Sequence, residues 1–106
     1  MLSNPDKGDP GRLDQMVTVG VREEGDGWVC EVMVEDRGHT SHHTVTVGKA
    51  DLIRWGDGDD AASVDDLVSR SVRFLLEREP ASAILERFDL SVIPGYFPEY
   101  HEHFKS

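Results

Sequence analysis

The pattern of apolar and polar positions along the chain predicts three consecutive strands. Valines occupy every second position in residues 15–23, and residues 27–35 alternate in the same way. Residues 40–48 are rich in β-branched side chains, which favour strands. Glycine-containing turns at residues 24–27 and 36–39 separate the three segments and predict hairpins. We therefore expect an antiparallel β-meander.

The next long segment, residues 63–79, predicts one amphipathic helix. Its apolar residues recur at spacings of three and four, which places them on one face of a 3.6-residue helix. Ser63 and Asp66 have the spacing of a capping box, and Pro80 ends the periodic segment. We expect this helix to cover the valine-lined face of the sheet, because a small sheet needs a second layer to bury that face.

Shorter helices are expected on both sides of the long one. Residues 49–55 can form a short helix, and residues 80–88 are expected to form another that begins at Pro80. Further turns are expected at residues 91–96 and 99–104, the last as a helical turn or a frayed end. The predicted fold class is α+β, with a three-stranded antiparallel meander covered on one face by one long helix, and with short C-terminal helices.

Length and composition are consistent with one domain. Residues 1–14 combine prolines, glycines and aspartates and are predicted to be a flexible tail, while residues 15–106 form a single α+β domain. The chain has 11 basic and 21 acidic side chains and a net charge of −10, which disfavours nucleic acid and anionic membranes as partners. The sequence shows neither a signal-peptide pattern nor an apolar run of roughly 20 residues. A cytoplasmic protein is expected.

Catalytic and cofactor motifs are missing from the sequence. It has no nucleophile elbow, no phosphate-binding loop and no zinc-ligand spacing. The single cysteine, Cys30, falls within a predicted strand and is interpreted as a buried thiol. A calcium-loop template that starts at Asp57 fails at three positions, including Val68 where a glutamate is needed. We expect no catalytic residue, no cofactor and no metal site, which favours a non-enzymatic protein.

Histidines are the main reason to keep an alternative open. His39, His42 and His43 lie in or near the third strand, and His101 and His103 lie near the C-terminus. Adjacent residues of a strand point to opposite faces, so His42 and His43 cannot both reach one ion. The alternative is a small enzyme, or a ligand- or metal-binding protein, that uses the histidine-bearing face of the sheet.

The C-terminal third of the chain is dense in aromatic residues and prolines. Tyr96, Phe97 and Tyr100 either fold back to close the core or form an exposed patch for a partner, since aromatic residues are enriched in interfaces. On the long helix, Arg70 and Arg73 can bind an anion or pair with carboxylates four positions away. The candidate interaction surface combines aromatic and basic side chains: Tyr96, Phe97, Tyr100, His42, Arg70 and Arg73.

Three short motifs in this region resemble a pattern found in small uncharacterised prokaryotic proteins. They are L-L-E-R-E-P at residues 75–80, F-D-L at residues 88–90 and Y-F-P-E-Y at residues 96–100, and the similarity extends loosely back to Trp28. The resemblance implies a single domain and no particular function.

The expected function is that of a small interaction, accessory or regulatory module. Its partner is another protein or a second copy, since pairing in a homodimer hides the exposed edges of a small sheet. An acidic antitoxin-like protein is a further alternative, which rests on size and net charge.

Overall fold

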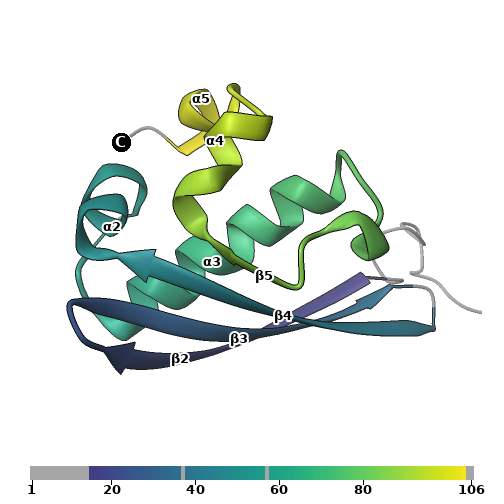
Figure 1. Ribbon diagram of the computed structural model, residues 1–106, viewed down its shortest axis with the longest axis horizontal. Coiled ribbons are helices and arrows are strands. Elements are labelled where there is room, and N and C mark those ends of the chain that lie inside the picture. The colour runs from purple at the N-terminus through teal and green to yellow at the C-terminus, as the bar shows by residue number, and fades with distance from the viewer. Residues whose placement is uncertain (1–14, 37, 57, 105–106) are drawn as a thin grey trace, which may run out of the picture.

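The chain folds as an α+β unit built on a four-stranded mixed sheet. The computed structural model describes residues 15–36, 38–56 and 58–104. The sheet has the strand order β2-β3-β4-β5. The strands are β2 (Gln15–Glu24), β3 (Gly27–Asp36), β4 (His39–Gly48) and β5 (Arg87–Asp89). Figure 1 shows the sheet along the bottom, with helix α3 (Ala61–Leu76) lying across it.

The predicted antiparallel meander is confirmed, with each strand within one residue of its expected ends. Gly25 has a φ of 59°, a value that glycine adopts at little cost, and it lets β2 and β3 join through a two-residue loop. Val19 lies opposite Val32, and Cys30 lies opposite Val45, so the apolar positions of all three strands share one face. That inner face forms one side of the core.

Helix α3 covers the inner face, as predicted, but its ends differ from the predicted ones. It begins at Ala61, before the predicted start at residue 63, and it ends at Leu76, before the predicted end at residue 79. The predicted capping box is wrong. The carboxylate of Asp60 is the cap and accepts hydrogen bonds from the Ser63 amide (3.0 Å) and hydroxyl (2.7 Å). A carboxylate at this position also complements the positive end of the helix dipole.

The predicted helix at residues 80–88 is wrong, because this segment supplies the fourth strand. Pro80 is followed by a single 3₁₀ turn, η1 (Ala81–Ala83), and the chain then extends into β5, parallel to β4. Phe88 lies opposite Val45 and is buried with the core. Pairing with the edge of β4 and burial of Phe88 therefore override the helical spacing of Ile84 and Phe88.

A carboxylate fixes the end of β5. Asp89 accepts a hydrogen bond from the Thr46 hydroxyl on β4 (2.6 Å) and others from the amide and hydroxyl of Ser91 (3.1 and 2.6 Å). Partial burial raises the pKa of Asp89, but the bonds from Ser91 and Thr46 outweigh it and hold the pKa below its usual range. The ionised carboxylate thus ties β4 to the start of the next turn.

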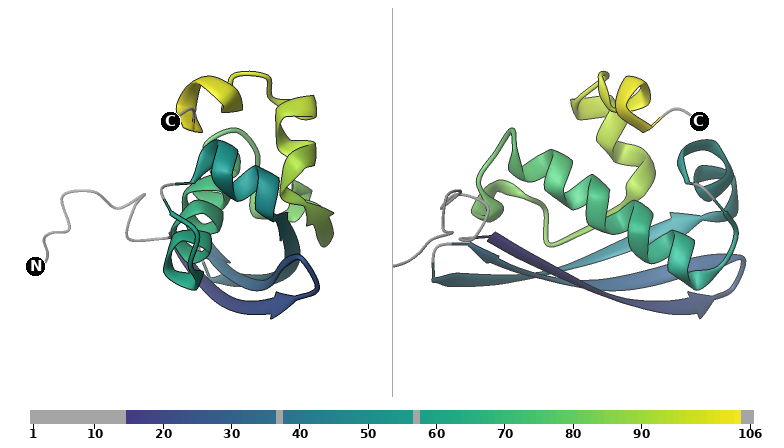
Figure 2. Two further views of the ribbon diagram at one scale, coloured as in Figure 1. Left: turned by 90° about the vertical axis from the view of Figure 1, so that its left-hand side faces the viewer. Right: turned by 180° about the vertical axis from the view of Figure 1, so that it is seen from behind.

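The C-terminal elements form a further layer on α3. They are α4 (Ile93–Tyr96) and α5 (Tyr100–Phe104), whereas η2 (Leu90–Val92), which precedes them, lies against β4. Both views of Figure 2 show α4 and α5 over α3, on the side away from the sheet. Tyr100 is fully buried, and its hydroxyl lies 2.6 Å from that of Ser71 on α3. Burial raises the pKa of Tyr100 to about 12, so this hydroxyl stays protonated.

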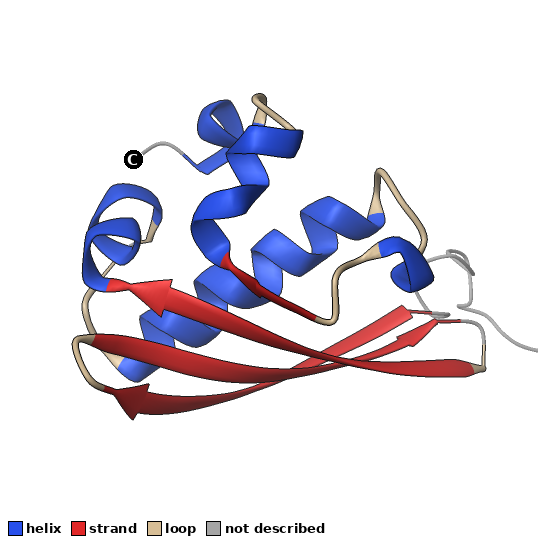
Figure 3. Cartoon of the chain, viewed as in Figure 1, coloured by secondary structure: helices blue, strands red, loops and turns tan. Residues whose placement is uncertain are grey.

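The other short helix, α2 (Lys49–Trp55), forms at its predicted position. Its Trp55 packs edge-on against Tyr100, with ring centroids 5.1 Å apart. Figure 3 shows the described helices on one side of the sheet, which leaves the opposite, outer face of the sheet uncovered by any of them. None of the helices in residues 15–104 that the structure describes has the length and apolar character needed to cross a membrane.

Candidate functional site

An open apolar pocket lies between the end of α3, the segment that leads into β5, and α4. Its volume is about 180 Å³. We call it the C-terminal pocket. Its floor is formed by the buried side chains of Leu75, Phe88 and Ile93, and its rim by Glu79, Leu85, Val92 and Tyr96.

The rim concentrates exposed apolar surface. Among the residues that the structure describes, five large apolar side chains are exposed, and three of these line the pocket. Tyr96 is 69% exposed, Leu85 is 50% exposed and Val92 is 36% exposed. Scattered apolar residues are ordinary on a protein surface, whereas a cluster around a concavity is typical of binding sites. The C-terminal pocket is therefore the candidate functional site.

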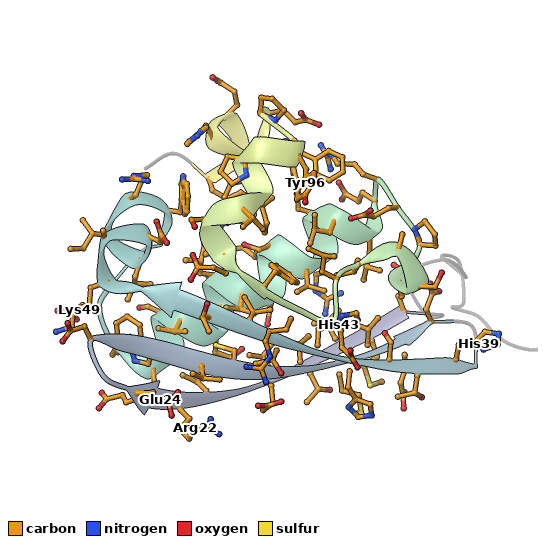
Figure 4. The ribbon with its side chains drawn as sticks, viewed as in Figure 1. Arg22, Glu24, His39, His43, Lys49 and Tyr96 are labelled. Atoms are coloured by element: carbon orange, nitrogen blue, oxygen red, sulfur yellow. The ribbon has the colours of Figure 1, made fainter. Side chains whose placement is uncertain are left out.

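Hydrogen bonds from β4 hold the Leu85 side of the rim. Nδ1 of the buried His43 donates to the Leu85 carbonyl (2.8 Å), because a carbonyl can only accept. Nε2 lies 2.9 Å from the Ser41 hydroxyl, which donates to it when the ring is neutral. The Thr44 amide donates to the Glu86 carbonyl next to it (2.8 Å). Figure 4 shows His43 on β4, beneath the segment that precedes β5.

Beside the pocket, an arginine joins the end of α3 to the segment that precedes α5. The guanidinium of Arg78 lies 3.6 Å from the centre of the Phe74 ring and donates to Glu99 (3.0 Å) and to the Phe74 carbonyl (3.0 Å). A hydrogen bond from its own backbone and the one from Arg78 hold the pKa of Glu99 below its usual range. Phe97, between α4 and α5, packs edge-on against Phe74. These contacts hold the segment that follows α4.

Two of the predicted interaction residues lie in this pocket, and one is buried away from it. Tyr96 and Phe97 both line the pocket, and Figure 4 shows Tyr96 at the outer end of α4. Tyr100 contributes to the core instead, where its ring stacks on Phe104. The aromatic segment is thus divided, with Tyr100 in the core and Tyr96 exposed at the pocket, and the binding of a partner by this segment stays a prediction.

The remaining predicted residues are dispersed. Arg70 pairs with Asp66 (2.9 Å) and its guanidinium lies 5.0 Å from the centre of the Phe104 ring. Arg73 is exposed on α3. His42 is exposed on the outer face of the sheet, whereas its neighbour His43 is buried on the inner face, as the strand period predicts. The structure does not bring His42 to the C-terminal pocket.

Three rim residues were missed from the sequence, namely Glu79, Leu85 and Val92. They come from three segments that are joined only by the packing of β5 and α4 on α3. The only signal available was that Leu85 and Val92 are apolar residues just outside predicted inward-facing positions. That signal is weak, because single exposed apolar residues are common.

Within the described ranges, no group of three or more His, Cys, Asp and Glu residues could hold a metal ion. Asp57, where the calcium-loop template starts, and the predicted tail at 1–14 lie outside the described residues. Burial raises the pKa of the Cys30 thiol to about 11, which keeps it neutral and unreactive.

Comparison with protein-family models, with curated proteins and with solved structures found no match. The resemblance of residues 75–100 to small prokaryotic proteins therefore stays a prediction.

Proposed function

We propose that the protein is a small non-enzymatic interaction module and that the C-terminal pocket is where it binds a protein partner. The main support is the gathering of Leu85, Val92 and Tyr96 around an apolar floor. Covering these side chains removes apolar surface from water, which stabilises a complex by roughly 25 cal/mol per Å² before the costs of association. Tyrosine is also among the residues that contribute most to binding energy in interfaces.

The size of the pocket favours a side chain of a partner over a free ligand. Sites for small molecules and cofactors occupy roughly 300–1,000 Å³ and enclose most of their ligand. The C-terminal pocket holds about 180 Å³ and is open to solvent. A volume of about 150 Å³ accommodates a benzene ring. The pocket is thus suited to one large apolar side chain that projects from a partner.

The chemistry of the pocket walls favours binding over catalysis. Its described lining includes one carboxylate, that of Glu79, and one phenol, that of Tyr96. General acid–base catalysis needs groups positioned within hydrogen-bonding reach of a reacting atom, usually with a second group to orient them. The outer face of the sheet carries His42 opposite Met33, with threonines and glutamates around them. Met16 and Val29 are also on this face, but Met16 is its only exposed large apolar side chain among the described residues, compared with three around the pocket. The outer face therefore supports the alternative ligand-binding function less well.

A pull-down from native lysate with matched variants tests the proposal. The test variant combines Tyr96→Ser with Leu85→Ser, and the control is Ile53→Ser, which changes an apolar residue that is 74% exposed on α2. All the changed side chains are largely exposed, so the variants should keep the thermal stability of the wild type. We expect one partner to be recovered by the wild type and the control and to be lost with the test variant.

The same variants test whether the partner is a second copy of the chain. In that case light scattering would show a wild-type dimer that the pocket variant converts to a monomer. Retention of every captured protein by the pocket variant, together with an unchanged oligomeric state, would contradict the proposal.

A further inference from the structure

One charged side chain, that of Glu79, stands in the wall of the C-terminal pocket. Its backbone is anchored, because its amide donates to the Leu75 carbonyl at the end of α3 (2.9 Å). Its side chain is half-buried. Over the described part of the chain, no hydrogen bond or ion pair engages its carboxylate. The neighbouring carboxylates of Glu77 and Glu99 differ, since both pair with Arg78 (3.2 and 3.0 Å).

A partner that fills the pocket removes water from this carboxylate. An ionised carboxylate that loses its water without gaining a partner opposes binding. Arg78, the adjacent residue, is already engaged by Glu77, Glu99 and the Phe74 ring. The compensating charge therefore has to come from the occupant of the pocket.

The net charge of the whole protein also favours a cationic partner. The net charge is −10, and Glu86, next to Leu85 on the rim, is exposed. A surface potential of this sign raises the rate of encounter with cationic partners and disfavours anionic ones.

We infer that the occupant is a segment of a partner protein in which a bulky apolar side chain lies next to a lysine or an arginine. The apolar side chain fills the pocket between Tyr96 and Leu85, and the cationic group pairs with Glu79. The inference rests on the proposed function and specifies the chemistry of the partner. Lysine and arginine both suit this role, because each carries a long apolar stem along the pocket wall before its charged end.

Selection from a library of random 12-residue peptides displayed on phage tests the inference even while the natural partner is unidentified. The full chain is the bait, as the wild type, as Glu79→Lys and as the control Glu35→Lys. The control makes the same charge change at an exposed site on β3. We expect the wild type to enrich peptides with a bulky apolar residue next to Lys or Arg. Glu79→Lys should enrich the same apolar residue next to Asp or Glu, while Glu35→Lys should select as the wild type does.

Affinities of one enriched peptide, measured by fluorescence anisotropy, give the magnitude. Glu79→Gln should weaken binding about tenfold, equivalent to about 1.4 kcal/mol, and Glu35→Gln should change it less than twofold. A wild-type selection without basic residues would overturn the inference. So would a Glu35→Lys selection that shifts as much as that of Glu79→Lys, because net charge alone would then explain the preference.

The outcomes also separate the inference from the proposed function. Suppose that the selected peptides lack basic residues and bind the wild type but not the Tyr96→Ser, Leu85→Ser variant. This result would support docking at the pocket and refute only the requirement for a cation. Peptides that bind this variant as tightly as the wild type, or a selection that enriches no peptide, would contradict both.

Discussion

The bond between Tyr100 and Ser71 offers a quantitative test of how the C-terminal layer is held on α3. Both side chains are fully buried and their hydroxyl oxygens are 2.6 Å apart. Tyr100→Phe removes one hydroxyl and keeps the ring. The edge-to-face contacts of that ring with Trp55 (5.1 Å) and Phe74 (5.3 Å) should therefore survive. The variant isolates the hydrogen bond.

The expected loss follows from burial. A buried hydrogen bond contributes about 1 kcal/mol, and a buried hydroxyl left without a partner costs about 1–3 kcal/mol, so Tyr100→Phe should destabilise the fold by about 2 kcal/mol. For a chain of this size that loss lowers Tm by roughly 8–16 °C. Urea and thermal unfolding at pH 7, followed by far-ultraviolet circular dichroism, measure both quantities.

A double-mutant cycle with Ser71→Ala tests whether the two hydroxyls interact. Removing both hydroxyls leaves no orphaned group, so the double variant should be less destabilised than the sum of the single variants by at least about 1 kcal/mol. The gain in helix propensity from alanine appears in both Ser71→Ala backgrounds and cancels. Strictly additive losses, or a Tyr100→Phe loss below about 0.3 kcal/mol, would show that the bond does not hold the C-terminal layer on α3.

Three further predictions concern the core, the sheet edge and the support of the pocket. Cys30 is buried with a pKa of about 11, so a thiol reagent at pH 8 should label it only at the rate of unfolding; immediate labelling would contradict its burial. The pKa of Asp89 is lowered on folding despite its partial burial, so its stabilising contribution is present above about pH 4 and is lost as pH falls further. Thr46→Val should therefore destabilise the protein more at pH 7 than at pH 2.5, and equal losses at the two values would refute this linkage. A lysine at position 78 cannot stack on Phe74 while it bonds both Glu99 and the Phe74 carbonyl, as Arg78 does, so Arg78→Lys should cost about 1 kcal/mol, and unchanged urea unfolding would count against that role.

The meander was predictable because its signals are local. Alternating valines define the core-facing side of β2, and glycine-containing turns mark where each strand reverses. Each signal lies within about ten residues, and tertiary contacts reinforce it. The long helix was predictable for the same reason, although its cap was not, since Asp60 and Ser63 are both good N-cap residues and the sequence does not say which accepts.

The fourth strand depends on a contact that is distant in sequence. Phe88 and its neighbours form only three residues of strand, too few for alternation to be distinguished from helical spacing. What makes the segment extended is the edge of β4, where the hydroxyl of Thr46, 43 residues earlier, donates to Asp89. This pairing is a tertiary contact, so the local sequence around Phe88 does not reveal it.

Only part of the candidate site could be predicted, because its residues also come together through contacts that are distant in sequence. Tyr96 and Tyr100 are the same residue type four positions apart, yet Tyr96 ends α4 in solvent and Tyr100 begins α5 in the core. The separation results from the change of direction between the two short helices around Pro98, which composition does not encode. Leu85 joins the site because His43 fixes its backbone, a contact across 42 positions.

The most direct test of docking at the C-terminal pocket is a ¹⁵N–¹H correlation spectrum of the full chain, titrated with the partner recovered in the pull-down. We expect the largest shift changes to fall on Leu85, Val92 and Tyr96, with little change on the outer face of the sheet. Largest changes around His42 and Met33 on that outer face, with the pocket signals unmoved, would refute docking at the pocket.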